Sequence, residues 1–252
     1  MKISFLIPAF NEEPTIGKVL HKVLMLPFDD REIIVVDDAS TDSTSQIVED
    51  FQSRFDCIKL IRQSTNGGKT SAIDVAIQHA SGDVIIIQDA DLEYDPNEIP
   101  DIVAPIMADV ADVVYGSRFL VKRASRVLYF YHYLANKGLT FFSNILTNRN
   151  MSDIETCYKA FRKEVIKPIK LTSSGFGMEV EITAMVCKTR ARTYEVPISY
   201  YGRTYEEGKK IGLKDGIAAI WYIFYYNLIH PLTSPGKRYI ETVNEHLQSR
   251  SS

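Results

Sequence analysis

The stretch from residue 83 to residue 93 constrains the fold of this chain more than any other. Four β-branched residues, 84–87, are followed closely by two aspartates, Asp89 and Asp91. A short run of this kind predicts a strand buried on both faces, which is typical of parallel sheets covered by helices. Carboxylates at the carboxyl end of such a strand can face the crevice where open α/β sheets bind ligands. They predict a divalent-cation site shared with substrate phosphates, with solvated loop acids or a helix cap as the alternative.

Strands and helices alternate along the first 120 residues. Strands are expected over residues 3–7, 32–36, 57–61, 84–87 and 112–116, and helices over residues 15–26, 43–55, 70–80 and 96–107. This alternation predicts a parallel, doubly wound sheet with helices on both faces. The length of 252 residues is enough for one large α/β domain, which we favour over two small ones.

Beyond residue 120 the sequence becomes richer in Leu, Phe and Tyr. Amphipathic helices with a broad apolar face are expected over residues 127–146 and 213–232, and a shorter helix over residues 178–189. Strands are expected over residues 156–162 and 193–198. The domain therefore extends over residues 1–232, and the polar residues 233–252 predict a loosely held tail. We expect no spanning helix, because no window reaches about 20 continuous apolar residues.

Charge and cysteine content exclude several classes of protein. The net charge of −3 argues against a general nucleic-acid binder, which needs a basic surface. The three cysteines are an odd number without metal-type spacing, which predicts reduced thiols and a cytoplasmic location rather than a disulfide framework. The first residues are apolar over too short a stretch for a secretory signal, and they predict the first strand instead.

Polar clusters follow four of the predicted strands. They are residues 8–12 (PAFNE), 37–40 (DDAS), 89–91 (DAD) and 116–118 (GSR). Because the carboxyl ends of parallel strands lie along one edge of a sheet, these clusters are expected to converge. Any one of them could cap a helix, and Asn11, Ser40 and Thr41 are candidates. Together, however, they predict a nucleotide pocket.

Particular side chains suit such a pocket. Asp37 or Asp38 could accept hydrogen bonds from a base, and Lys69 could reach a base or a phosphate. The first turn lacks the glycine spacing of dinucleotide folds, and residues 66–70 lack the upstream glycine of a P-loop. Redox and ATPase functions are therefore disfavoured.

The order of these motifs resembles that of family 2 glycosyltransferases, which have the GT-A fold. The resemblance rests on residues 8–12, 36–42 (VDDASTD), 66–69 (NGGK), 88–96 (QDADLEYDP) and 116–118. Two later segments, 175–181 (GFGMEVE) and 195–204 (EVPISYYGRT), are similar to the dolichol-phosphate mannose synthase branch. The resemblance extends over residues 3–230 and divides the domain into a nucleotide-binding half, 1–120, and an acceptor half, 121–232.

The resemblance implies a metal-dependent, inverting transfer of a sugar from a nucleotide-sugar to a polyprenyl or dolichyl phosphate. GDP-mannose is the first expected donor, and UDP-glucose and UDP-N-acetylglucosamine are the alternatives. Asp89, Asp91 and Glu93 would hold Mg²⁺ or Mn²⁺ on the diphosphate, with Glu93 at a position where this branch often has Gln. The residues expected at the nucleotide are Pro8, Ala9, Asn11, Glu12, Asp37, Asp38, Lys69 and Asp89.

An acceptor phosphate defines the rest of the expected site. A phosphomonoester is mostly dianionic at pH 7 and needs no strong base, but bringing two anionic groups together requires cations. Arg118, Arg203 and Lys209, together with Asp91, are therefore the candidate catalytic residues, and Ser117, Arg118, Glu179 and Arg203 are expected near the acceptor. The loop over residues 199–211 is a candidate lid. Glu179 could instead simply favour the start of its helix.

A lipid acceptor also predicts contact with a membrane. The aromatic-rich helices over residues 127–146 and 213–232 could lie in the interface at the cytosolic face. Nearby basic residues would favour anionic lipid; they are Lys122, Arg123, Arg126, Lys209, Lys210 and Lys214. Alternatively, these faces pack on the sheet, on a small membrane partner subunit or in a homodimer.

Two other functions remain open. The chain could be a family 2 transferase with a soluble or polysaccharide acceptor. It could also be a nucleotide-sugar-binding scaffold protein without catalytic activity, although the intact Asp89 and Asp91 argue against this.

Overall fold

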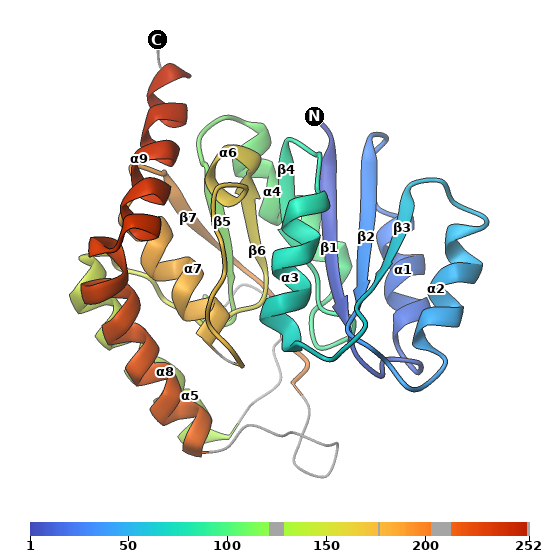
Figure 1. Cartoon of the computed structure of the whole chain (residues 1–252), viewed down its shortest axis with the longest axis horizontal. Coiled ribbons are helices and arrows are strands. Elements are labelled where there is room, and N and C mark those ends of the chain that lie inside the picture. The colour runs from blue at the N-terminus through green and yellow to red at the C-terminus, as the bar shows by residue number, and fades with distance from the viewer. Residues whose placement is uncertain (121–128, 176, 203–212, 251–252) are drawn as a thin grey trace.

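In the computed structural model, the described residues are 1–120, 129–175, 177–202 and 213–250. Within them, seven strands form one sheet in the order β3-β2-β1-β4-β6-β5-β7 (Figure 1). Their bounds are β1 (Ile3–Ala9), β2 (Arg31–Asp37), β3 (Ile58–Arg62), β4 (Val84–Ile87), β5 (Val113–Ser117), β6 (Lys159–Arg162) and β7 (Thr193–Pro197). All neighbouring pairs are parallel except those of β6, which runs antiparallel to β4 and β5. The predicted mostly parallel sheet is confirmed.

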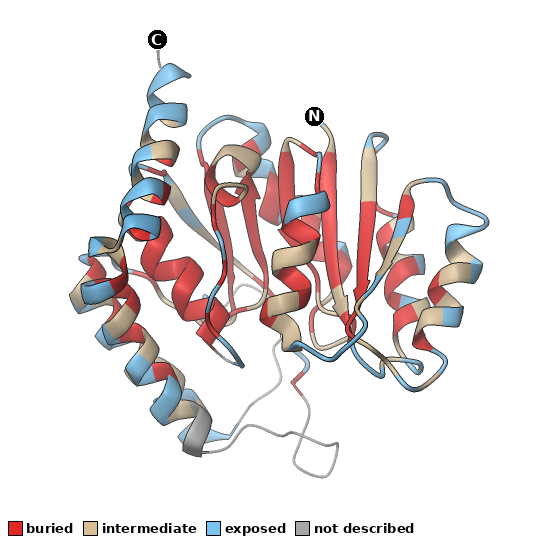
Figure 2. Ribbon diagram, in the orientation of Figure 1, coloured by how far each residue is buried: buried red, intermediate tan, exposed pale blue. Residues whose placement is uncertain are grey.

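Alternate side chains of the strands enter two separate hydrophobic cores. In β4, Val84 and Ile86 enter one core, while Ile85 and Ile87 enter the other. This follows from the period of two in a strand, and it explains why β4 needs apolar residues at every position. Figure 2 shows the buried strands enclosed between layers of helices.

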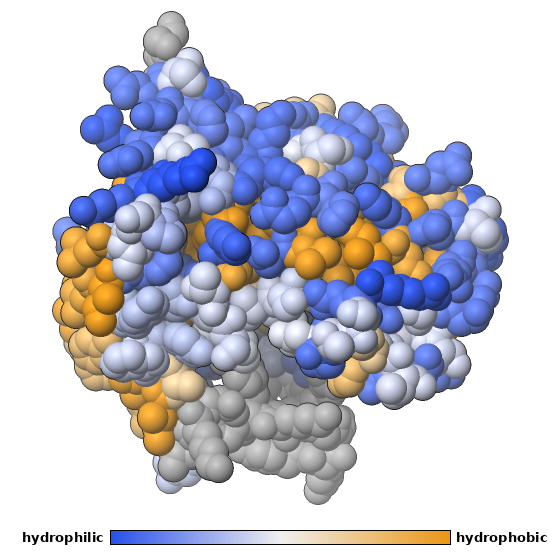
Figure 3. All heavy atoms as spheres, in the orientation of Figure 1, coloured by the Kyte–Doolittle hydropathy of each residue, from blue (hydrophilic) through white to orange (hydrophobic). Residues whose placement is uncertain are grey.

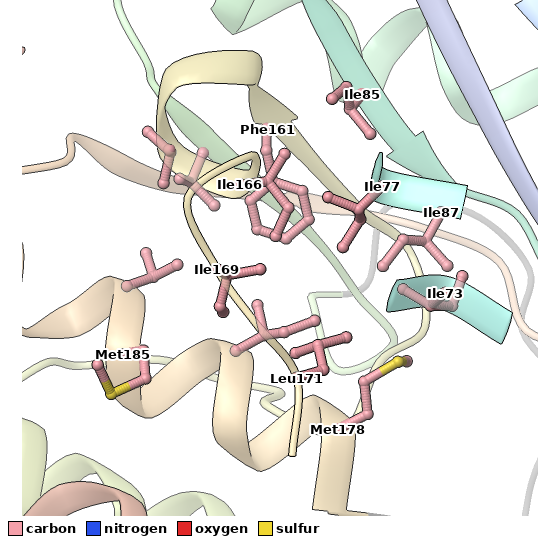
Figure 4. Close-up of a cluster of buried hydrophobic side chains, with 14 of the residues drawn as sticks. Ile73, Ile77, Ile85, Ile87, Phe161, Ile166, Ile169, Leu171, Met178 and Met185 are labelled. Carbon is pink, nitrogen blue, oxygen red and sulfur yellow. The ribbon is translucent and has the colours of Figure 1, made fainter. Parts of the chain in front are cut away.

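Helices cover both faces of the sheet. On one face lie α1 (Ile16–Leu24), α2 (Thr44–Gln52) and α4 (Ile99–Met107), the last preceded by a short 3₁₀ turn (Pro96–Glu98). On the other lie α3 (Gly68–His79), α6 (Lys163–Ile166) and α7 (Gly177–Cys187). Figure 4 shows this second core, where Ile73 and Ile77 of α3 approach Ile87 of β4. The alternating elements expected from the sequence are therefore present.

The second half of the described chain adds three further helices beyond the sheet. They are α5 (Phe130–Thr147), α8 (Leu213–Phe224) and α9 (Ser234–Ser249). A π-helical turn (Tyr225–Ile229) and a 3₁₀ turn (His230–Leu232) join α8 to α9. In the described parts of the chain, no helix combines the length and the apolar character needed to cross a bilayer.

The expectation of a loosely held tail after residue 232 is wrong. Tyr239 and Val243 of α9 are buried against the core beneath α7, and the Tyr239 hydroxyl donates a hydrogen bond to the Val165 carbonyl at 3.1 Å. The helix also has a defined start, because the Thr233 side chain accepts a hydrogen bond from the Gly236 amide. Tyr239, Val243 and Leu247 lie four residues apart and form one narrow apolar stripe along the helix. This stripe is hard to recognise in the sequence because most of the segment is polar.

Candidate active site

A pocket of about 220 Å³ lies at the carboxyl edge of the sheet. Its described lining comes from the ends of β1 and β4, the turn after β2 and the start of α3. The residues are Pro8, Ala9, Phe10, Glu12, Asp38, Lys69, Ala72, Asp89, Ala90 and Asp91. Three of the four polar clusters thus meet, as expected from the parallel topology. Asn11 and Asp37, also predicted to bind the nucleotide, are not among these lining residues.

Lys69 connects the acidic motif after β4 to α7. Its ammonium nitrogen lies 2.7 Å from Oδ1 of Asp89 and 3.4 Å from Oε1 of Glu179. Burial alone would raise the pKa of Asp89, but the adjacent Lys69 ammonium holds that pKa below its usual value. Asp89 is therefore an anion at neutral pH, and Lys69 balances its charge inside the pocket.

Asp38 shapes the turn that brings Lys69 into the pocket. Its two carboxylate oxygens accept hydrogen bonds from the Gly67 and Gly68 amides, at 2.8 and 2.7 Å. Gly68 has a φ of 81°, a conformation that glycine adopts without strain. The carboxylate thus satisfies two amides at the start of α3 while still lining the pocket. Each oxygen retains a second lone pair for a ligand donor.

Asp37 is buried next to this turn at the end of β2. Its Oδ2 accepts a hydrogen bond from the Ser45 hydroxyl at 2.7 Å. Its Oδ1 is buried and has no hydrogen-bond partner among the described residues. Of the two aspartates, Asp37 therefore has the orphaned acceptor, although Asp38 is the one that lines the pocket.

The cluster after β1 is locked to the turn after β2. Asn11 has a φ of 55°. Its backbone amide donates a hydrogen bond to the Ser40 hydroxyl at 2.9 Å, and its side-chain oxygen accepts one from the Thr41 backbone amide at 2.8 Å. The Glu12 amide donates to the Thr44 hydroxyl at 2.8 Å. Asn11 thus has the structural role of bridging the two turns, and Glu12 is held at the pocket.

The model of the family named glycosyl transferase family 2 matches residues 4–169. This chain belongs to that family. The dolichol-phosphate mannosyltransferase of Pyrococcus furiosus is 31% identical over 215 residues, which are 84% of this chain and 60% of that protein. An uncharacterised protein of Methanocaldococcus jannaschii is 31% identical over 225 residues, which are 82% of this chain and 93% of that protein. The chain thus spans less than two thirds of the Pyrococcus relative.

Solved structures show the same fold. The glucosyl-3-phosphoglycerate synthase of Mycobacterium tuberculosis, in complex with Mn²⁺, UDP-glucose and phosphoglyceric acid, has a TM-score of 0.69 and 18% sequence identity. The match covers 89% of this chain and 79% of that one. With UDP, Mn²⁺ and glucosyl-3-phosphoglycerate bound, the same enzyme gives a TM-score of 0.67 at 19% identity. The family 2 chain therefore has the GT-A fold expected from its motifs.

The acidic motif of this family 2 chain offers ligands suited to a divalent cation. Asp89 and Asp91 both line the pocket, and carboxylate oxygens are ligands that Mg²⁺ and Mn²⁺ prefer. Among the described residues, no group of three His, Cys, Asp or Glu side chains surrounds a single point. A pair is enough for Mg²⁺, which usually binds one or two carboxylates together with substrate phosphates. The residues fit the expected ion.

Glu93 faces the chain that follows β7. Its Oε2 accepts a hydrogen bond from the Tyr200 hydroxyl at 2.8 Å, and its carbonyl accepts one from the Tyr201 amide at 2.8 Å. Glu93 therefore joins the acidic motif to residues 199–202, which begin the expected lid. Its predicted part in holding the metal stays a prediction. The remainder of that loop, with Arg203 and Lys209, lies outside the described residues.

Arg118 has a partner that the sequence did not reveal. Its Nε and Nη2 donate to the two carboxylate oxygens of Asp153, at 2.7 and 2.8 Å, and the guanidinium stacks on the Tyr200 ring at 5.1 Å. Both side chains of the ion pair are almost fully buried. The hydroxyls of Ser117 and Ser152 form a hydrogen bond with each other at 2.6 Å. Arg118 thus has a fixed orientation, and the guanidinium has five N–H donors, so some remain for an acceptor.

Three residues of the segment before β6 complete the site and were missed from the sequence. Asp153 orients Arg118, and Glu155 follows two residues later in the chain. Cys157 places its sulfur 3.1 Å from the Lys69 nitrogen. The available signal was the presence of two acids directly before a predicted strand. Buried acids of that kind need partners or a function.

Proposed function

We propose that this chain transfers a sugar from a nucleotide-sugar to a polyprenyl phosphate, with inversion at the anomeric carbon and with GDP-mannose as the donor. The observation that carries the proposal is the 31% identity to a dolichol-phosphate mannosyltransferase over 84% of this chain. The acid-lined pocket at the carboxyl edge of the sheet supports it, because this is where such folds bind nucleotides.

The nucleoside diphosphate would occupy the pocket. Asp89 and Asp91 would hold Mg²⁺ or Mn²⁺, which when bound neutralises the charge that develops on the departing diphosphate. Asp38 and Glu12 offer acceptors for the nucleoside, and Lys69 supplies a positive charge beside Asp89. These groups are held by backbone and side-chain bonds before the ligand arrives, which favours electrostatic stabilisation of the transition state.

The acceptor phosphate would act as the nucleophile. One of its oxygens forms a bond to the anomeric carbon while the bond from that carbon to the diphosphate oxygen breaks, and the nucleoside diphosphate leaves. A dianionic phosphate has no proton to lose, so no general base is required. Arg118, oriented by Asp153, would attract this phosphate. Arg203 and Lys209 are further candidates for it.

We also propose that α5 and α8 lie on the membrane that carries the lipid acceptor. Together they expose large apolar side chains, and Figure 3 shows hydrophobic surface where these helices lie in Figure 1. The exposed residues include Phe130, Tyr131, Leu134, Phe141, Ile145, Ile217 and Trp221. A patch of this kind marks a membrane or protein contact, and Tyr and Trp suit the headgroup region. The basic side chains expected beside it lie outside the residues whose side chains are described.

The test is a transfer assay with a labelled sugar. Wild-type protein would be incubated with GDP-mannose, UDP-glucose or UDP-N-acetylglucosamine, with Mg²⁺ or Mn²⁺, and with a short-chain polyprenyl phosphate or with 3-phosphoglycerate. Labelled lipid from GDP-mannose is expected. Labelled lipid from a UDP-sugar would show that the donor is a UDP-sugar and not GDP-mannose. Labelled phosphoglycerate would show that the acceptor is soluble and not a lipid. No product in any arm, with nucleotide-sugar still bound, would favour a scaffold protein.

The same assay tests the acidic motif. We expect Asp91→Asn to reduce transfer about 100-fold or more, because even residues that only support metal ligands contribute 10- to 100-fold. Asp56→Asn, which changes an exposed acid away from the pocket, is the matched control and should leave transfer unchanged. Equal activity of the two variants would contradict the assignment of Asp91.

A further inference from the structure

Glu155 lies in the chain between two residues that contact Arg118 and Lys69. It belongs to the segment that joins α5 to β6. Two residues before it, Asp153 binds Arg118, and two residues after it, Cys157 contacts Lys69. Lys69 pairs with Asp89 where the donor diphosphate is proposed to bind, and Arg118 is the proposed ligand of the acceptor phosphate. The transferred sugar must pass between these two phosphates, and Glu155 belongs to the segment that contacts the residues proposed at both.

The Glu155 side chain is not satisfied within the protein. Its Oε1 is buried and has no hydrogen-bond partner among the described residues, although the residue as a whole is only half-buried. Leaving a buried acceptor unpaired is destabilising, and native proteins rarely do so without another reason. Where a native protein does leave a polar group unsatisfied, the position is often a functional site. A ligand that supplies the missing partner is such a reason.

The charges around Glu155 indicate what kind of ligand this is. The side chain faces Glu179 of α7, Lys159 of β6, Arg118 after β5, and Asp153 of its own segment. Burial, followed by the nearby Glu179 carboxylate, raises the pKa of Glu155 to about 8. At pH 7 the carboxyl is therefore mostly neutral. A neutral carboxyl both donates and accepts hydrogen bonds, as a sugar hydroxyl does.

The structure assigns Glu155 to the transferred sugar: we propose that its carboxyl forms a hydrogen bond with a hydroxyl of the hexose carried by the nucleotide-sugar. This rests on the proposed function and adds the residue that recognises the sugar. Of the charged groups nearby, Glu179 pairs with Lys69 and the Lys159 ammonium donates to the Thr156 carbonyl. Among the described residues, Oε1 of Glu155 and the adjacent Thr156 hydroxyl are buried without a hydrogen-bond partner, so both are left for a ligand.

The experiment compares ligands with and without the sugar. Affinities for GDP, GDP-mannose, UDP and UDP-glucose would be measured by calorimetry with Mn²⁺ and no acceptor, for the wild type, Glu155→Leu and Glu155→Gln. We expect Glu155→Leu to bind the sugar nucleotide about tenfold more weakly while binding the free nucleotide as before, since that is the usual effect of one lost hydrogen bond. Glu155→Gln, which can still donate and accept, should recover most of this affinity.

Stability provides a second measurement with the opposite sign. Replacing an unpaired buried polar group by an apolar one can be neutral or stabilising, so the melting temperature of Glu155→Leu should be equal to or higher than that of the wild type. Glu245→Gln, which changes an exposed acid on α9, is the control variant. It should change neither the ligand affinities nor the melting temperature. A residue with a merely structural role would lower stability and would affect both ligands alike.

Donor analogues lacking one hydroxyl identify the group that is bound. One deoxy analogue should bind equally to the wild type and to Glu155→Leu, because the interaction is already absent. If the wild type transfers sugar and Glu155→Leu binds sugar nucleotides normally, the inference is wrong and the proposed function stands. If the wild type binds no nucleotide-sugar, the proposed function is wrong and the inference falls with it.

Discussion

At the scale of single residues, the polar side chains of this protein are organised in pairs and small networks. At the carboxyl edge of the sheet, Lys69 forms ion pairs with both Asp89 and Glu179 before any ligand is bound. At the opposite edge, Glu32 accepts hydrogen bonds from the Ser4 and Ser81 hydroxyls and from the Ser81 amide. The first network serves the site, whereas the second joins β1 and β2 to the turn before β4.

The Glu32 network predicts a pH-dependent stability. Although burial acts to raise it, the hydrogen bonds led by that of Ser4 lower the pKa of Glu32 from 4.5 to about 2. A lowered folded-state pKa gives stability that is present above pH 4.5 and is lost as the pH falls toward 2. Glu32→Gln should therefore reduce the free energy of unfolding by about 1–2 kcal/mol at pH 7, with a smaller difference at pH 3.

Urea denaturation at both pH values measures this effect. Glu49→Gln, which removes a surface ion pair with Arg62, is the control and should have little effect at either pH. A difference between wild type and Glu32→Gln that stays constant from pH 7 to pH 3 would show that the carboxylate charge has no part in it.

At the scale of elements, β6 and α9 differ most from the sequence-based expectation. The strand near residues 156–162 is present, but it runs antiparallel between β4 and β5. Its direction depends on the path of the chain through α5, and a run of apolar residues does not encode direction. α9 was expected to be a loose tail because most of its residues are polar, whereas its few apolar residues share one face.

Packing of α9 is tested by Val243→Ala. The side chain of Val243 is fully buried in the core beneath α7. Removing two methyl groups there should lower the free energy of unfolding by about 2 kcal/mol, from lost burial and the cavity left behind. Glu241→Ala on the exposed side of the same helix is the control. Chemical denaturation distinguishes the two, and equal stability of both variants would mean that α9 does not belong to the folded core.

At the scale of the whole molecule, the protein has two distinct surfaces to which functions are proposed. The pocket proposed for the nucleotide lies at the carboxyl edge of the sheet, and the apolar face proposed for the membrane is formed by α5 and α8 (Figure 1, Figure 3). An enzyme with a water-soluble donor and a lipid acceptor needs both kinds of surface. Ile217 and Trp221 lie four residues apart on α8, and their exposed fractions of 62% and 61% place them on the outer side of the helix.

Membrane contact is tested by vesicle flotation. Wild-type protein is expected to float with vesicles of phosphatidylcholine and phosphatidylglycerol, and the double variant Ile217→Ser with Trp221→Ser should bind about tenfold more weakly or worse, because it loses apolar area for burial in the interface. Its melting temperature should not fall, since both side chains are exposed. Met25→Ser, an exposed apolar residue next to α1, is the control. If wild-type protein stays with the soluble fraction, the proposed membrane contact is wrong.

The sequence by itself determined the mostly parallel α/β architecture and the edge at which the pocket forms. Both could be predicted from the sequence because strand periodicity and turn residues are local properties. The shared direction of parallel strands then places Pro8, Asp38 and Asp89 on one edge of the sheet. Only the tertiary structure decided which charges pair. Arg118 meets Asp153 from 35 residues away, and Cys157 reaches Lys69 from 88 residues away. Such partners depend on how helices and loops pack across the sheet, and that packing also leaves the buried Oε1 of Glu155 without a hydrogen-bond partner among the described residues.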